Sequence, residues 1–162
     1  WKIPLLIHQP SYNLLNRWVD KSGLLDTLAD NGVGCIAFTP LAQGLLTGKY
    51  LNGIPDGSRM QTEGKKARGL TENMLSESNL SSLRLLNEMA QRRGQSMAQM
   101  ALSWLLKDSR VTSVLIGASR PEQIEENVKA LANLSFSAEE LAQIDKHVAD
   151  GQLNLWQASS DK

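Results

Sequence analysis

The sequence predicts an α/β fold with a parallel sheet, and two observations support this class. Three short runs, at residues 4–9, 34–39 and 112–117, are mostly apolar and lack a regular alternation with polar residues. Such runs are typical of parallel strands that are covered on both faces. Segments with a helical spacing of apolar residues lie between the runs, and strands that alternate with helices indicate parallel pairing.

The first two runs are joined by one predicted helix. Leu24, Leu25, Leu28 and Ala29 are spaced for one helical face within residues 23–31. The dipeptide at positions 31 and 32, Asn-Gly, is a stop signal for a helix. This part of the chain therefore reads as a βαβ unit.

The connection from the second run to the third is long. Residues 41–79 are mostly polar and rich in glycine, and we expect a loop there. Apolar positions repeat at helical spacing over residues 80–92, which predicts a helix that ends near Gly94. A second helix follows Ser96 over residues 97–106 and is so apolar that it should be largely buried.

Two more helices are predicted after the third run. Residues 121–132 should form a helix whose buried stripe consists of Ile124, Val128 and Leu131. Residues 138–149 should form another, opened by a capping box in which the residues at positions 137 and 140, Ser and Glu, satisfy each other's backbone donors. Three strands leave a small sheet with two open edges, which invite pairing with a second copy.

Composition and charge exclude several classes of function. Lys and Arg together number 17, as do Asp and Glu, so the net charge is zero and we expect no nucleic-acid binding. The apolar runs are far shorter than the ~20 residues of a membrane-spanning helix, so we expect no membrane insertion. Cys35 is the only cysteine, which rules out an internal disulfide and, with two histidines, a zinc site. A reducing, cytoplasmic location fits this composition, and the start at Trp1 indicates a piece of a longer protein.

The loop after the second run is the first candidate for a binding site. Gly44, Gly48 and Lys49 follow the end of a predicted strand, where backbone N–H groups can approach a phosphate. The loop is not a Walker A loop, because three residues instead of four separate Gly44 from Gly48, and Tyr50 stands where Ser or Thr would hold magnesium. A turn-rich connector with an exposed lysine explains the pattern equally well.

The second candidate lies where the third run leads into a helix. Ser119 stands near the helix N-terminus, where free N–H groups and the helix dipole favour a phosphate. Gln123, Glu126 and Asn127 share one face of this helix. The alternative is a second capping box between Ser119 and Glu122 with a solvated polar face, which is compatible with an anion site.

Together these segments resemble the carboxyl-terminal half of an aldo/keto reductase. The strings P-L-A-Q-G-L-L-T-G-K-Y at residues 40–50 and G-A-S-R-P-E-Q-I-E-E-N at residues 117–127 carry the resemblance, supported by Q-P-S-Y-N at residues 9–13 and A-L-S-W-L-L at residues 101–106. They occur in the family's order and cover nearly the whole chain. The likeness is greatest to the branch that holds potassium-channel β subunits and bacterial L-glyceraldehyde 3-phosphate reductases.

This resemblance implies a fold and an activity. The fold would be a partial (β/α)8 TIM barrel: residues 1–162 would form a single region holding the last three strands, their helices and the C-terminal tail. The activity would be NADPH-dependent reduction of small-molecule carbonyl substrates. The family's catalytic Asp, Tyr, Lys and His would lie upstream of Trp1, so no catalytic residue and no metal ligand is assigned, and the isolated chain should be inactive. The alternatives are an NADPH-sensing regulatory subunit of the channel β type and a truncated inactive fragment.

The resemblance also implies roles for individual residues toward NADPH. Gln9 would hydrogen-bond the nicotinamide carboxamide, and Phe38 would stack on the nicotinamide ring. The pyrophosphate would follow Thr39, Pro40, Leu41, Ala42, Gln43 and Gly44, with Lys49 and Arg59 adding positive charge. The 2′-phosphate would lie near Gly117, Ser119 and Gln123, and the adenine near Glu126 and Asn127.

Overall fold

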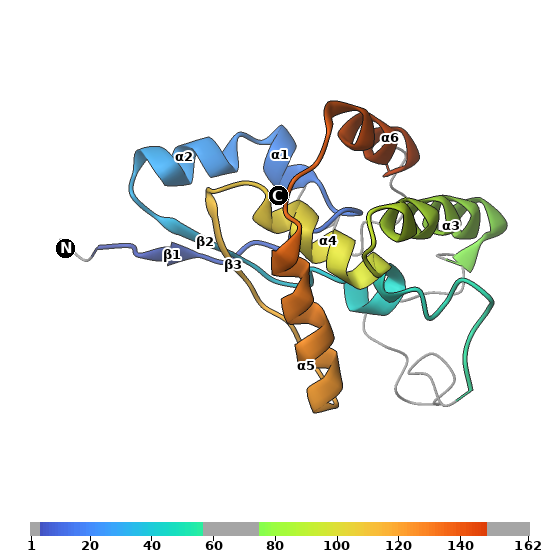
Figure 1. The fold of residues 1–162 in the computed structure, drawn as a ribbon. Helices are drawn as coiled ribbons and strands as arrows, with labels where there is room; N and C mark the ends of the chain where they lie inside the picture. The colour runs from blue at the N-terminus through green and yellow to red at the C-terminus, as the bar shows by residue number, and fades with distance from the viewer. Residues whose placement is uncertain (1–3, 57–74, 149–162) are drawn as a thin grey trace.

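Three parallel strands form the sheet, as expected. The computed structural model describes residues 4–56 and 75–148. Within these ranges, one sheet has the order β1-β2-β3, with strands β1 (Ile7–His8), β2 (Gly34–Ala37) and β3 (Val111–Val114) (Figure 1). The α/β class with a parallel sheet is thus confirmed. The strands are shorter than the apolar runs that predicted them.

The expected helices are present in the structure. It has α1 (Trp18–Lys21), α2 (Leu24–Asp30), α3 (Glu77–Arg92), α4 (Met97–Leu106), α5 (Pro121–Val128) and α6 (Ala138–Val148), with 3₁₀ helices at Ala42–Thr47 (η1) and Lys129–Ala132 (η3). The bounds of α2, α3, α4 and α6 lie within three residues of the predicted ones. The short α1 was not predicted, and η1 lies inside the expected loop. The expected helix over residues 121–132 is α5 followed by η3.

Local hydrogen bonds explain where several helices begin and end. Gly32 adopts a φ of 65° after α2, and the next N–H, of Val33, donates to the Leu28 carbonyl at 2.9 Å. Before α6, the N–H of Glu140 donates to the Ser137 hydroxyl at 3.1 Å and the N–H of Ser137 donates to the Glu140 carboxylate at 2.7 Å. The predicted capping box is therefore confirmed.

Helix α4 lies at the centre of the helical part and contacts β3, η1, α3 and α5 (Figure 1). Nearly all of its side chains are buried, as the sequence predicts. Trp104 is 1 % exposed and meets the ring of Tyr12 edge to face, with 5.5 Å between the ring centroids. Cys35 of β2 is also fully buried, and burial raises the pKa of its thiol. The core therefore forms between the sheet and α4.

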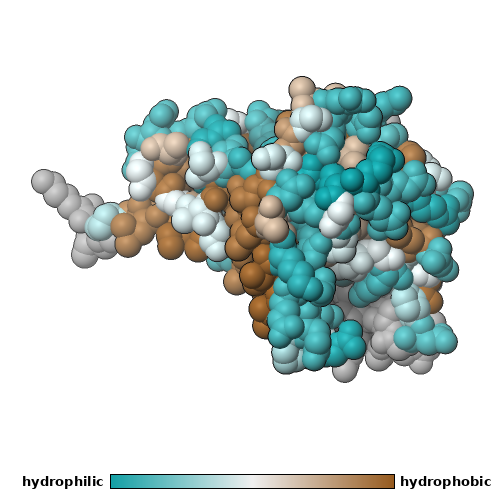
Figure 2. All heavy atoms as spheres, in the orientation of Figure 1, coloured by the Kyte–Doolittle hydropathy of each residue, from teal (hydrophilic) through white to brown (hydrophobic). Residues whose placement is uncertain are grey.

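One face of the molecule stays apolar and open, which corrects two expectations. The expected buried stripe of α5 is wrong: Ile124, Val128 and Leu131 are 49 %, 55 % and 58 % exposed. The strands are not covered on both sides either, since Ile7 of β1 is 51 % exposed, and Leu6 and Leu115, which flank β1 and β3, are exposed as well. Figure 2 shows apolar atoms gathered along the strands and the adjoining side of α5. Periodicity identified an apolar face correctly, but no other described residue covers that face. No helix in the described ranges is long and apolar enough to cross a membrane.

Candidate functional site

The carboxyl ends of the three strands meet at one edge of the sheet. Gln9 follows β1 and is exposed, Phe38 follows β2 and is half-buried, and Gly117 lies three residues beyond β3 and is exposed. Pairing continues past the strands, because the N–H of Tyr12 donates to the Phe38 carbonyl at 3.3 Å. Loops at this edge of a parallel sheet are the usual place for a ligand.

The loop after β2 has an unusual backbone. Thr39, Ala42 and Gln43 have φ values of 54°, 47° and 55°, a region that non-glycine residues rarely adopt, and Gly44 follows with a φ of 103°. Pro40 and Ala42 are buried, so the Ala42 side chain is turned into the core. The N–H groups of Ala42 and Gly44 donate to the carbonyls of Thr39 and Leu41 at 3.0 and 2.8 Å, so they close the turn. Strained backbone of this kind concentrates at binding sites.

Lys49 folds back across the glycine of this loop. A Cβ at Gly44 would lie 2.9 Å from Lys49 Cε and 3.1 Å from its Nζ, so a side chain there would displace the lysine. The Nζ lies 4.7 Å from the centroid of the Tyr50 ring. Lys49 is exposed and forms no ion pair with any residue of the described ranges. Its ammonium group therefore lies beside Gly44 at the carboxyl end of β2.

At the start of α5, Gln123 bonds to Ser119. The N–H of Ser119 donates to Gln123 Oε1 at 2.8 Å, and the two side chains approach to 3.2 Å. The alternative capping box between Ser119 and Glu122 is wrong, because α5 begins after Arg120 without a side-chain cap. Gln123 therefore bonds to Ser119 in place of Glu122.

The other two predicted residues of α5 face α4. Asn127 is 9 % exposed and is the buried residue of the helix. Gln99 donates through Nε2 to the Glu126 carboxylate at 3.1 Å and to its carbonyl at 2.9 Å, while Lys129 pairs with the same carboxylate. These bonds fasten α5 to α4, which also contacts η1.

Apart from Gln9, Phe38 and Gly117 near the strand ends, the predicted residues thus fall into two groups, one on the loop after β2 and one at α5. The first holds Thr39 to Gly44 together with Lys49, and the second holds Ser119, Gln123, Glu126 and Asn127. The pairing of β2 with β3 brings the two groups to one edge of the sheet, since the N–H of Leu115 donates to the Ala37 carbonyl at 2.8 Å. Arg59 lies outside the described residues.

Sequence reasoning missed a buried polar cluster beneath the loop after β2. Ser11, Asn13 and Asn16 are 7 %, 2 % and 2 % exposed. Asn13 Nδ2 donates to the Thr39 carbonyl at 2.8 Å, and Ser11 Oγ lies 3.0 Å from Thr39 Oγ1. Polar residues spaced two and three apart directly after a strand were the available signal, because Asn in such a place commonly closes an Asx turn.

Tyr12 has a structural role. Its hydroxyl donates to the Asp20 carboxylate, and burial together with this contact raises the pKa of Tyr12. Arg17 pairs with Asp20 and stacks 4.4 Å from the centroid of the Trp104 ring. A tyrosine whose pKa is raised and whose proton is held by a carboxylate is a weak acid at neutral pH, so it fits a structural contact rather than proton donation.

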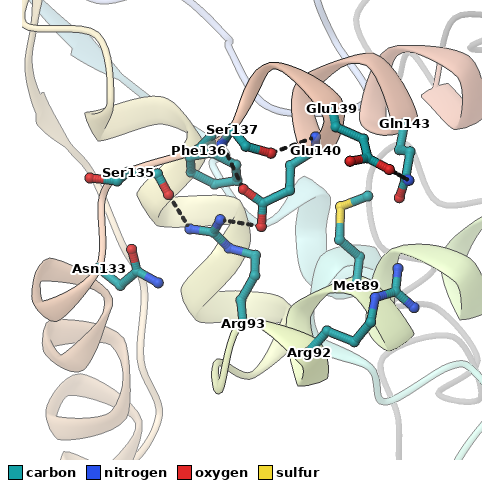
Figure 3. A pocket seen from close by; sticks show the side chains of 10 residues that line it. All are labelled: Met89, Arg92, Arg93, Asn133, Ser135, Phe136, Ser137, Glu139, Glu140 and Gln143. Atoms are coloured by element: carbon teal, nitrogen blue, oxygen red, sulfur yellow. Dashed lines mark hydrogen bonds and ion pairs between the residues drawn. The ribbon is translucent and has the colours of Figure 1, made fainter.

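A cavity of about 740 Å³ lies elsewhere, between α3 and α6 (Figure 3). Arg93 fastens its walls: the guanidinium pairs with Glu140 at 2.7 Å, donates to the Ser135 carbonyl at 2.8 Å and lies 3.7 Å from the centroid of the Phe136 ring. No residue predicted to bind a cofactor lines this cavity. Within the described ranges, no group of three or more His, Cys, Asp or Glu side chains could hold a metal ion.

Comparison with known proteins gives the class of this chain. A model of the aldo/keto reductase family matches residues 1–149, and the chain belongs to that family. It is 85 % identical over all 162 residues to the L-glyceraldehyde 3-phosphate reductase of Escherichia coli (strain K12), of which it covers 47 %. The chain thus spans about half the length of that curated relative.

Two further relatives widen the comparison. A putative voltage-gated potassium channel subunit beta of Schizosaccharomyces pombe is 38 % identical over 85 % of this chain and 40 % of its own length. An aldo-keto reductase from Klebsiella pneumoniae, solved in complex with NADPH, matches with a TM-score of 0.57 and 26 % identity over 87 % of this chain and 38 % of that structure. The resemblance inferred from the sequence motifs is therefore confirmed.

Proposed function

We propose that this chain is the cofactor-binding part of an NADPH-dependent carbonyl reductase. Its three strands would be the sixth, seventh and eighth of a (β/α)8 barrel, completed by an upstream segment. The share of each relative that the chain covers, near half or less, supports this assignment. So does the open apolar face, because barrel strands are covered by their neighbours and by an outer ring of helices.

The observation that carries the proposal is the strained loop after β2 with Lys49 folded across Gly44. Because Gly44 has no Cβ, the Lys49 side chain can lie across the loop and hold its ammonium group at the end of β2, where a phosphate would find a positive charge. We assign the pyrophosphate of NADPH to this loop, lined by Thr39, Pro40, Leu41, Ala42, Gln43 and Gly44, with Lys49 and Arg59 supplying positive charge.

The remaining residues would hold the two ends of the cofactor. Gln9 and Phe38 stand at the ends of β1 and β2, where an amide and an aromatic face would hold the nicotinamide. Gly117, Ser119 and Gln123 would surround the 2′-phosphate at the N-terminus of α5. Glu126 and Asn127 would bind the adenine, one turn further along the same helix.

The chain's own contribution to the reaction is binding and orientation. When bound, NADPH supplies the hydride that reduces a carbonyl carbon. Phe38 would fix the nicotinamide face, and Gln9 would fix its rotation. The proton donor would come from the upstream segment. The substrate class is an aldehyde or ketone, and L-glyceraldehyde 3-phosphate, named for the E. coli relative, is the first compound to test.

The test uses a chimera in which these 162 residues replace the matching region of the E. coli relative. Lys49→Ala should weaken NADPH binding about tenfold at low ionic strength and less at high salt, because a surface charge contact is screened. Gln123→Ala should weaken NADPH more than NADH, which lacks the 2′-phosphate. Lys146→Ala, on the exposed side of α6, is the matched control. Unchanged dissociation constants for both site variants would show that the cofactor is placed wrongly.

The similarity to a channel β subunit supports a second candidate, an NADPH-sensing regulatory subunit. A sensor needs tight cofactor binding but little turnover. Intact NADPH binding with turnover of the natural full-length protein below about 0.01 s⁻¹ for every aldehyde tried would favour this role, since typical enzymes turn over at ~1–10³ s⁻¹.

A further inference from the structure

Thr39 holds a backbone conformation that its own side chain disfavours. Its φ of 54° lies in the left-handed region, where a β-branched residue is an outlier. Such a residue persists only when its surroundings over-determine it. Thr39 is also the first residue of the loop assigned to the pyrophosphate, so its conformation sets the direction in which the chain enters that loop.

The side chain of Asn13 supplies one constraint. Its Nδ2 donates to the Thr39 carbonyl at 2.8 Å, and the N–H of Ala42 donates to the same carbonyl at 3.0 Å. Asn13 cannot rotate freely, because its Oδ1 accepts from the N–H groups of Leu15 and Asn16 at 2.9 and 3.0 Å. The carbonyl that opens the η1 turn is thus pinned from the neighbouring loop.

A series of hydrogen bonds, each side chain donating to the next group, supplies the second constraint on Thr39. Asn16 Nδ2 donates to Ser11 Oγ at 3.1 Å, and the Thr39 hydroxyl donates to the Phe38 carbonyl at 2.7 Å. Because the Thr39 hydroxyl proton is used there, Ser11 must donate to Thr39 Oγ1 over the 3.0 Å between them. Buried bonds aligned in this way strengthen one another.

We propose that Asn13 is a positioning residue for the cofactor, with Ser11 as its helper. It is assigned no contact with NADPH itself; it holds Thr39 in the left-handed conformation from which residues 40–44 follow. This inference rests on the proposed function. A conformation held before the ligand arrives lowers the ordering cost of binding, so the tether should contribute to affinity and not only to stability.

The experiment measures NADPH dissociation constants and thermal midpoints in the same chimera. Asn13→Asp keeps an oxygen for the Leu15 and Asn16 N–H groups but replaces the donor to Thr39 with an acceptor. It should weaken NADPH binding about tenfold. In the Thr39→Gly background the same change should raise the NADPH dissociation constant less than about threefold, because glycine adopts the left-handed region without the bond from Asn13. Asn31→Asp is the matched control, since Asn31 Nδ2 donates to the Thr27 carbonyl at the same 2.8 Å on the exposed end of α2.

Each outcome decides between defined alternatives. If Asn13→Asp lowers the thermal midpoint but leaves the dissociation constant unchanged, the tether is only structural and the inference is wrong. An equal loss with and without Thr39→Gly also overturns it. If Asn13→Asp does not fold, Ser11→Ala takes its place and should weaken binding about threefold, because it removes one donor without adding charge. If Lys49→Ala and Gln123→Ala are also without effect, the proposed function fails instead.

Discussion

At the scale of single residues, Gly44 and Gly53 separate two effects of a glycine. Both have a positive φ, of 103° and 107°. A Cβ at Gly53 would meet nothing within 4 Å, whereas one at Gly44 would meet the Lys49 side chain. Gly44 is therefore needed both for its backbone conformation and for the space beside it, whereas Gly53 is needed only for its backbone conformation.

This pair gives a prediction with a built-in control. Gly44→Ala and Gly53→Ala should each lower the free energy of unfolding by about 1–2 kcal/mol, because alanine is strained at such φ values. Only Gly44→Ala should also weaken NADPH binding, by about tenfold, since it displaces the Lys49 ammonium group. Urea unfolding and fluorescence titration with NADPH measure the two effects in the chimera. Equal losses of affinity would refute a specific role for Gly44.

At the scale of elements, Arg93 and Glu140 join α6 to the end of α3. The Arg93 side chain is 4 % exposed and the Glu140 side chain 28 %. Partial burial raises the pKa of Glu140, but the Ser137 N–H and the Arg93 guanidinium favour the carboxylate, so the pKa lies below its usual value. A carboxyl whose pKa is depressed in the fold stabilises the fold above its unfolded pKa, and this stabilisation disappears as the pH falls through the folded pKa.

Glu140→Gln should therefore lower the free energy of unfolding by about 1 kcal/mol at pH 7, after solvent screening of the exposed part of the pair. The difference in the free energy of unfolding between the unchanged chain and Glu140→Gln should shrink below about pH 4.5, where the carboxyl of the unfolded chain takes up its proton. Denaturant midpoints between pH 7 and pH 3 give the measurement. Glu139→Gln, one residue away and exposed, is the control. A difference that stays constant with pH would contradict the assigned charge contact.

Features set by neighbours in sequence could be predicted, and features set by tertiary partners could not. The stop after α2 and the capping box of α6 depend on residues within five positions, so the motif contains the whole cause. The partner of Ser119 is also local, yet the capping-box alternative chose Glu122. The structure has Gln123 instead, because its long side chain reaches Ser119 from one position further. The Asn13–Thr39 bond spans 26 positions, and nothing in either segment alone indicates it.

The candidate site shows the same division. The motifs placed glycine, lysine and glutamine after the right strands, since loop position follows from strand order. They did not reveal that Thr39, Ala42 and Gln43 adopt left-handed φ values, and the contact of Thr39 with Asn13 comes from another segment, which the loop sequence alone does not indicate. The apolar stripe of α5 was identified as a face that needs covering, but periodicity carries no information about what covers it.

At the scale of the whole molecule, the isolated chain should not reduce carbonyl compounds. Within the described ranges Tyr12 is bound to Asp20 and buried, which leaves it unsuited to donate a proton. Purified 162-residue chain should show no NADPH oxidation above background with L-glyceraldehyde 3-phosphate, while the chimera should turn over. The chimera with Phe38→Ala is the matched control for cofactor orientation. Turnover by the isolated chain would refute the assignment of the proton donor to an upstream segment.

The open apolar face tests whether the chain is part of a larger barrel. If an upstream segment covers Ile124 and Val128, a charge at Ile124 must be buried there without a partner, which is costly. Ile124→Glu should then lower the free energy of unfolding of the chimera by about 2–4 kcal/mol but leave the unfolding of the isolated chain nearly unchanged. Glu125→Gln, exposed in the middle of α5, should leave the stability of both within about 0.5 kcal/mol.

Analytical ultracentrifugation is a second measurement, because a face covered by another copy would make the isolated chain a dimer that Ile124→Glu dissociates. A chimera as stable with Ile124→Glu as without it would show that the face is not covered in the larger protein, and the partial-barrel assignment would fail.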